Sequence, residues 1–151
     1  MKDLYLLFIA FLFFQIDTLA QAPDMLWTKT YKGIGSAEGH SVQQTSDGGY
    51  IVTGSSWNSA RHDVYLMKTD SSGDTLWTKY FSDQFYASPI IADEKVWLLD
   101  RTGMMHIINA GPEYQLVAES PLGEPSDCTP AFSDKNIYIR TRNNLFCISA
   151  N

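Results

Sequence analysis

The feature that most constrains the fold is internal repetition, and the sequence contains two repeats of different period. The tetrapeptide Leu26-Trp27-Thr28-Lys29 returns unchanged fifty residues later as Leu76-Trp77-Thr78-Lys79. A four-residue identity that includes a tryptophan indicates a duplicated structural unit. Periods of roughly 20 to 50 residues are typical of solenoids, propellers and other arrays, in which each repeat is one supersecondary unit.

Two hairpin patterns lie between the copies of this tetrapeptide. The segments HSVQQT and YIVTGSS flank Asp47-Gly48-Gly49, which supplies the positive φ that a tight turn requires. In the same way, DVYLMKTD and DTLWTKYF flank a turn around Gly73. Four strands in two hairpins predict one antiparallel sheet.

From Tyr86 onward the repeat has a period of forty-one residues, without a gap. Each copy reads as a proline, a short apolar strand, a turn at an aspartate, a strong strand, a polar turn and a further strand. A strand from Tyr114 to Glu119 and a loop from Pro121 to Pro125 lie between the copies. The aligned pairs are Pro89 with Pro130, Asp93 with Asp134, Val96 with Ile137, Trp97 with Tyr138, Arg101 with Arg142, Ile107 with Ile148 and, in the same register, His106 with Cys147.

Several of these strands, such as VWLLD, are apolar at consecutive positions instead of alternating. A strand of this kind needs cover on both faces of its sheet, as a propeller blade has between its two neighbours. Four strands in each period of forty to fifty residues are also typical of a propeller. We predict an all-β protein, a partial β-propeller of about three four-stranded antiparallel blades. An ordinary β-sandwich is the alternative.

The same segments resemble two kinds of known repeat. Residues 26–81, with LWTKTY, SVQQTSDGGYIVTGSS and DVYLMKTDSSGDTLWTKYF, resemble β-propeller repeats of secreted and surface proteins of Bacteroidota and some archaea. Residues 86–148, with YASPIIADEKVWLLDRTG, AGPEYQLVAESPLGEP and TPAFSDKNIYIRTRNNLFCI, resemble the last repeats of pyrroloquinoline-quinone-like (PQQ-like) β-propeller proteins. We therefore expect a first propeller-type repeat unit at 23–81 and PQQ-like repeats at 82–151.

This resemblance implies a tryptophan that docks each blade against its neighbour, and Trp27 and Trp77 stand at that place. The turn before Trp77, from Asp70 to Thr75, is one residue tighter than the PQQ-like pattern. Propellers of this kind close with six to eight blades, whereas this chain supplies about three. We expect a truncated or rearranged gene product. A protomer that completes a ring by self-association is the alternative.

The N-terminus has the pattern of a secretory signal peptide at residues 1–22. Lys2 gives a positive start, Leu4 to Phe14 is an uninterrupted apolar run, and Ala20-Gln21-Ala22 offers small residues for cleavage. The run is shorter than the roughly 20 residues that span a bilayer. We therefore expect export to the periplasm, the cell surface or the medium. An uncleaved N-terminal anchor is the alternative.

The net charge and the two cysteines bear on nucleic-acid binding and on disulfide formation. The formal net charge is −6 and the basic residues are scattered, so we expect no nucleic-acid binding. Cys128 and Cys147 could form a disulfide in an exported chain. We expect two separate thiols that pack as small hydrophobic side chains.

A quinone-dependent dehydrogenase would need a Ca²⁺ site, a catalytic aspartate and adjacent cysteines, and no residues match these requirements. We assign no catalytic, cofactor-binding or metal-binding residues and no cofactor. The oxygen-rich loop from Asp70 to Asp74 reads as a hairpin turn because the acidic residue that closes a calcium loop is missing. His40, His62 and His106 each lack a second ligand at zinc spacing.

Other candidate chemistry is equally weak. Ser88, Ser126 and Asp127 lack the G-x-S-x-G context of a hydrolase, and the glycine-rich stretch at 32–36 lacks a strand-to-helix context. The remaining candidates for a binding surface are three aromatic side chains at strand ends or in loops, for which core packing is the competing interpretation: Trp57, Tyr86 and Tyr114.

The functional prediction is an exported, non-catalytic scaffold for binding or assembly, with a protein or a polysaccharide as partner. The alternative is a set of non-catalytic blades from a propeller-fold enzyme, either quinone-dependent or carbohydrate-active.

Overall fold

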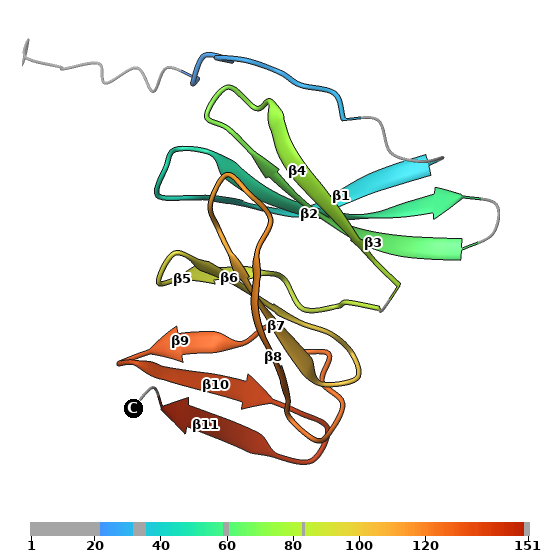
Figure 1. Ribbon diagram of the computed structural model, residues 1–151, viewed down its shortest axis with the longest axis vertical. Coiled ribbons are helices and arrows are strands. Elements are labelled where there is room, and N and C mark those ends of the chain that lie inside the picture. Colours follow the sequence, from blue (N-terminus) through green and yellow to red (C-terminus); the bar gives the residue numbers. More distant parts are fainter. Residues whose placement is uncertain (1–21, 32–35, 59–60, 83, 150–151) are drawn as a thin grey trace, which may run out of the picture.

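The structure, a computed structural model, describes residues 22–31, 36–58, 61–82 and 84–149. In these residues eleven strands form three antiparallel sheets, stacked face to face along the long axis of the molecule (Figure 1). The all-β prediction is therefore confirmed. The first and second sheets have four strands each, and the third has three among the described residues. Residues 1–21 of the predicted signal peptide and most of the 32–36 stretch lie outside these residues.

The first sheet follows the two predicted hairpins. Its strands pair in chain order and are β1 (Ser36–Gln44), β2 (Tyr50–Asn58), β3 (Arg61–Thr69) and β4 (Thr75–Phe81). The turns that join β1 to β2 and β3 to β4 place Gly48 and Gly73 at φ of 82° and 81°, a region that residues with a side chain rarely adopt. The turn prediction is confirmed at both places.

The second and third sheets repeat one hairpin. The second contains β5 (Ile90–Ala92), β6 (Lys95–Leu99), β7 (Met104–Asn109) and β8 (Leu116–Pro121), and the third contains β9 (Ala131–Ser133), β10 (Asn136–Arg140) and β11 (Leu145–Ser149). β5 and β6 lie forty-one residues before β9 and β10, as predicted. The two-residue turns Asp93-Glu94 and Asp134-Lys135 both have positive φ, which suits a tight hairpin.

The sequence alignment at a spacing of forty-one is wrong for the next strand, β11. Leu99 pairs with Met105 across a five-residue connection, whereas Arg140 pairs with Leu145 across only four residues. Every residue of β11 is therefore displaced by one position relative to β7. In consequence Ile148 pairs with Ile137 as Ile108 pairs with Val96, and His106 corresponds to Phe146, not to Cys147.

Two apolar clusters hold the three sheets together, one on each face of the second sheet. Val96, Leu98 and Ile108 pack with Ile51, Leu66 and Phe81 of the first sheet. Leu99 and Met105 pack with Ile139 of the third sheet, with Trp97 and Phe146 around them. The second sheet is thus covered on both sides, as its apolar strands predict. A β-sandwich has only two layers, so that alternative is wrong.

The fourth strand of the second sheet is placed slightly differently from the prediction. β8 begins at Leu116 and ends at Pro121, whereas the sequence pattern places the strand from Tyr114 to Glu119. The backbone N–H of Asn109 donates to the carbonyl of Gln115 at 2.9 Å, which keeps Tyr114 in the connection between β7 and β8. A register shift between Ile107 and Ile108 accompanies this longer turn.

Candidate functional site

A pocket of about 600 Å³ opens between the first two sheets, and we call it the Tyr86 pocket. One wall comes from β1 and β2, and the other from the segment that leads into β5. The lining is mainly polar on the first sheet, where the imidazole Nε2 of His40 lies 2.9 Å from the hydroxyl of Ser55. The polar and aromatic lining residues include His40, Ser41, Ser55, Gln84, Tyr86 and Ser88.

Tyr86 is a fixed and accessible aromatic surface in this pocket. Its side chain is 67% exposed, and the guanidinium of Arg101 lies 4.3 Å from the centre of its ring. Arg101 is itself held in place, because its Nε donates to Asp127 at 2.7 Å and its Nη1 donates to Gln84 at 2.8 Å. The bond to Asp127 raises the pKa of Arg101, so the cation is present at every ordinary pH. The ring and its polar neighbours are therefore arranged before any ligand arrives.

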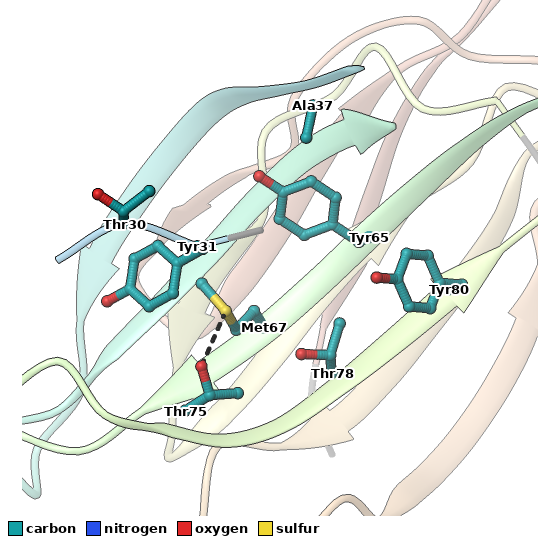
Figure 2. A pocket seen from close by; sticks show the side chains of 8 residues that line it. All are labelled: Thr30, Tyr31, Ala37, Tyr65, Met67, Thr75, Thr78 and Tyr80. Atoms are coloured by element: carbon teal, nitrogen blue, oxygen red, sulfur yellow. Dashed lines mark hydrogen bonds between the residues drawn. The ribbon is translucent and has the colours of Figure 1, made fainter. Parts of the chain in front are cut away.

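A second hollow, of about 330 Å³, lies on the face of the first sheet that turns away from the second sheet. Figure 2 shows the rings of Tyr31, Tyr65 and Tyr80 around it, with the sulfur of Met67 at its floor. The rings of Tyr65 and Tyr80 are 6.4 Å apart, and burial is the main cause that raises the pKa of Tyr65. We call this surface the outer face of the first sheet.

Residues 22–31 run along this outer face without joining the sheet as a strand (Figure 1), and we call them the N-terminal segment. The ring of Trp27 meets Tyr50 edge-on at 5.7 Å. Lys29 forms an ion pair with Asp74 at 2.7 Å, and the hydroxyl of Tyr31 donates to the carbonyl of Gly73 at 2.8 Å. Trp27 therefore contacts the first sheet, but it does so from a segment that is not a strand of a neighbouring blade among the described residues.

Trp77 makes the same kind of contact one sheet further on. Its indole N–H donates to the carbonyl of Gly111 at 3.1 Å, and its ring meets Tyr114 edge-on at 5.4 Å. Lys79 lies over the ring of Tyr114, 5.5 Å from its centre. Trp77 therefore ties the first sheet to the second, as predicted.

His106 belongs to a buried polar cluster in the second sheet. Its imidazole lies 2.9 Å from Glu119 and 3.3 Å from Asp100, and the rings of Phe81 and Phe85 cover it. Burial opposes ionisation of Asp100, but hydrogen bonds from Thr102, the N–H of Met104 and His106 hold its pKa below the usual value. This cluster joins the turn before β7 to β8, which is a structural role.

Lys68 is a buried ionic residue that the sequence pattern does not reveal. Its ammonium is fully buried and donates to Thr45, Asp47 and the carbonyl of Thr69, each at 2.9 Å. Hydrogen bonds from Thr45, Lys68 and Gly49 lower the pKa of Asp47 to about 2 despite partial burial. Because partners satisfy the cation, we assign this ion pair to the stability of the β1–β2 turn.

The loop from Asp70 to Asp74 is the predicted hairpin turn. One carboxylate oxygen of Asp70 accepts the backbone N–H groups of Ser72 and Asp74, each at 2.9 Å. His40 and His106 lie in different sheets, and the side chain of His62 is outside the described part of the structure. Among the described residues, no group of three or more His, Cys, Asp and Glu side chains is placed to hold a metal ion.

The remaining polar candidates have separate structural partners. The N–H of Ser88 donates to Thr129 at 2.9 Å, the hydroxyl of Ser126 donates to the carbonyl of Arg140 at 2.7 Å, and Asp127 holds Arg101. Cys128 and Cys147 are free and exposed, so the expectation that they pack as small hydrophobic side chains is wrong. For Cys147 the cause is the one-residue displacement of β11, which turns it to the outer face of the third sheet.

The three aromatic candidates do not form one surface. Tyr86 lines the pocket between the first two sheets, whereas Tyr114 contacts Trp77 in the connection before β8. Trp57 lies near the end of β2 and is half exposed. Sequence reasoning named Tyr86 but missed Arg101 beneath it, although Arg101 is part of the forty-one-residue repeat.

Comparisons with known proteins give a likeness in fold only. No protein-family model matches the chain, and no curated protein matches it. Among solved structures, the chain is similar to BamB from Moraxella catarrhalis, with 17% sequence identity and a TM-score of 0.43. The match covers 66% of this chain and 39% of that one, so the chain spans less than half of BamB. The described part of the chain contains no helix that is long and apolar enough to cross a bilayer.

Proposed function

We propose that the chain is an exported, non-catalytic scaffold that binds a polysaccharide at the Tyr86 pocket. The observation that carries this proposal is the pairing of an exposed, fixed aromatic ring with a polar pocket wall. A sugar ring presents C–H groups that pack on an aromatic face and hydroxyl groups that seek hydrogen bonds. Sites for small ligands combine an apolar surface with a few fixed polar groups in the same way.

The polar groups of the pocket suit hydroxyl ligands better than an ionic one. Ser41 and Ser55 on the first sheet are uncharged donors and acceptors, while the charge of Arg101 is already paired with Asp127. A protein partner is the other candidate that the sequence allows. The proposal of export rests on the pattern of residues 1–22, and fractionation of cells that express the full chain tests it.

The binding proposal is tested by titration of the protein with a panel of soluble neutral and acidic polysaccharides. Tyr86→Ala removes the ring, and we expect it to weaken binding by tenfold or more, about 1.4 kcal/mol. Tyr138→Ala is the matched control because Tyr138 is a partly exposed tyrosine of β10 outside the pocket, and it should bind within about twofold of the original chain. Absence of binding across the panel, or equal losses in both variants, would contradict a polysaccharide site at Tyr86.

A further inference from the structure

The two copies of the tetrapeptide LWTK contact equivalent places in successive sheets. Trp77 lies in β4, the fourth strand of the first sheet, and docks on Gly111 in the connection between β7 and β8. Trp27 docks at Gly73, in the connection between β3 and β4, where a Cβ atom on the glycine would lie 2.9 Å from the indole ring. Each tryptophan thus meets the turn between the third and fourth strands of the sheet that follows it.

This equivalence defines the place that the N-terminal segment occupies. β4 is the fourth strand of a sheet that packs on the second sheet. The N-terminal segment therefore stands where the fourth strand of a sheet packed on the first sheet would stand. The described residues contain no such sheet on that side (Figure 1).

The third sheet has the complementary shape. Its strands β9, β10 and β11 correspond to β5, β6 and β7, and no strand in the described part of the chain corresponds to β8. Among the described residues no strand lies beside the outer edge of β11, and an open edge is a template for strand addition. One end of the described stack presents an extra fourth strand, and the other end presents a sheet of three.

We propose that two copies of this chain close head to tail into a ring. The N-terminal segment of each copy pairs with β11 of the other copy as its fourth strand. Each chain then contributes three four-stranded sheets, and two chains give six. Six lies within the range of about four to eight blades that closes a propeller. A head-to-tail contact that closes in this way ends at a dimer and does not extend into a filament.

Exposed apolar side chains agree with this arrangement. Leu26 in the N-terminal segment is 91% exposed and Leu145 on β11 is 69% exposed, and the ring covers both side chains. In the ring, the outer face of the third sheet, with Tyr138, Arg140 and Leu145, covers the hollow between Tyr65 and Tyr80 (Figure 2). Arginine over a tyrosine ring is a favourable contact.

The faces of the added strand provide a cross-linking test. Side chains alternate along a strand, so Lys29 shares with Trp27 the face that turns to the first sheet, whereas Thr28 points the other way. Cys147 lies on the outer face of the third sheet, which is the same face of the completed sheet. Lys79 pairs with Leu66, the equivalent of Leu145, so Lys29 comes opposite Leu145 on that face, two residues from Cys147. In a Cys128→Ser, Cys147→Ser, Leu145→Cys background, Lys29→Cys should therefore form a disulfide with position 145 of the second copy on mild oxidation. Thr28→Cys should not.

The readouts are the native mass of the full chain by light scattering and the mass on non-reducing gels. We expect twice the mass of one chain in solution, and a covalent dimer in the Lys29→Cys variant that disappears when the Leu145→Cys change is left out. Leu26→Asp should give monomers that remain folded, because Leu26 is exposed in the single chain. Leu116→Asp, a partly exposed leucine of β8 outside both end faces, should stay dimeric. Monomers at all concentrations, or equal cross-linking of the two cysteine variants, would overturn the proposal.

Discussion

The middle sheet and the two end sheets are built from similar strands, but they differ in how many of their faces are covered by a neighbouring sheet. In β6, residues of both faces are buried, with Leu98 turned to the first sheet and Leu99 to the third. In β10, only the face with Ile139 is buried, while Arg140 and Tyr138 on the other face remain accessible. Nearly the same sequence pattern therefore gives a closed layer in one place and an open one in another, because the neighbours differ.

In the described part of the chain, one face of each end sheet has no partner sheet. The outer face of the first sheet carries tyrosines and a methionine, and the outer face of the third carries a leucine, a tyrosine and a cysteine. Neither face is as apolar as the contacts inside the stack. Interfaces between folded proteins are of mixed polarity, whereas the core of a single fold is almost wholly apolar. The two outer faces therefore resemble an interface more than a core.

The sharpest test of this contrast compares two leucines at opposite extremes of burial. Leu98→Ala leaves a cavity between the first two sheets, and we expect it to lower the free energy of unfolding by about 2–5 kcal/mol. Leu145→Ala, on the open face of β11, should change it by less than about 0.5 kcal/mol in dilute protein. Urea unfolding measures both. Similar losses in the two variants would mean that the middle sheet is not the core.

A smaller difference should separate the two docking tryptophans. Trp77 is less exposed than Trp27 and donates a hydrogen bond to Gly111 between two sheets. Trp77→Ala should cost about 3 kcal/mol of the free energy of unfolding, and Trp27→Ala about 1 kcal/mol at a dilution where the chain is monomeric. Thermal unfolding at several protein concentrations checks this, and it should show the two costs converge as the concentration rises.

The smallest effect concerns acid stability. The pKa of Asp47 in the folded chain is about 2, below its usual value near 3.8, so its carboxylate contributes stability that is present above pH 4. That contribution is lost as the pH falls from 4 toward 2. Because Asp47 is 45% exposed, we expect only about 1 kcal/mol. Asp47→Asn should lower stability at pH 7 and flatten the profile below pH 4.

An equivalent test in the middle sheet uses Asp100. Its side chain is buried, and its pKa also lies below the usual value. Asp100→Asn should remove more stability than Asp47→Asn, because the neighbouring His106 loses its buried acceptor. Urea unfolding from pH 3 to pH 7 gives both profiles. A larger loss from Asp47→Asn would contradict the contrast between the middle sheet and the end sheets.

Much of the fold follows from the sequence because turns and alternation are local signals. The glycines at 48 and 73 and the Asp93 and Asp134 turns place the hairpins correctly. The one-residue displacement of β11 could not be predicted from the sequence. An ungapped alignment does not reveal that the connection between β10 and β11 has four residues where the one between β6 and β7 has five. The replacement of Gly103 by Asn144 is the one local hint. Lys68 was missed because its partner Asp47 lies 21 residues earlier, and a lone lysine in a strand reads as a solvent-facing residue.

The Tyr86 pocket shows a second limit. The sequence identified Tyr86 as a candidate, but Arg101 and Asp127 reach it from the β6–β7 turn and from the loop before β9. Their meeting depends on how the third sheet packs on the second. Contacts between sheets leave no local pattern, so they emerge only when the stack is assembled.

In the proposed ring, the two LWTK copies hold the same position, each as a fourth strand that docks on the next sheet. Hydrogen exchange at the backbone amides of residues 28–31, compared with residues 78–80 in β4, tests it most directly. In the full chain at high concentration, we expect strong protection of both stretches. On dilution or in Leu26→Asp, residues 28–31 should lose protection while residues 78–80 keep it. Rapid exchange at 28–31 at every concentration, beside a protected β4, would contradict it.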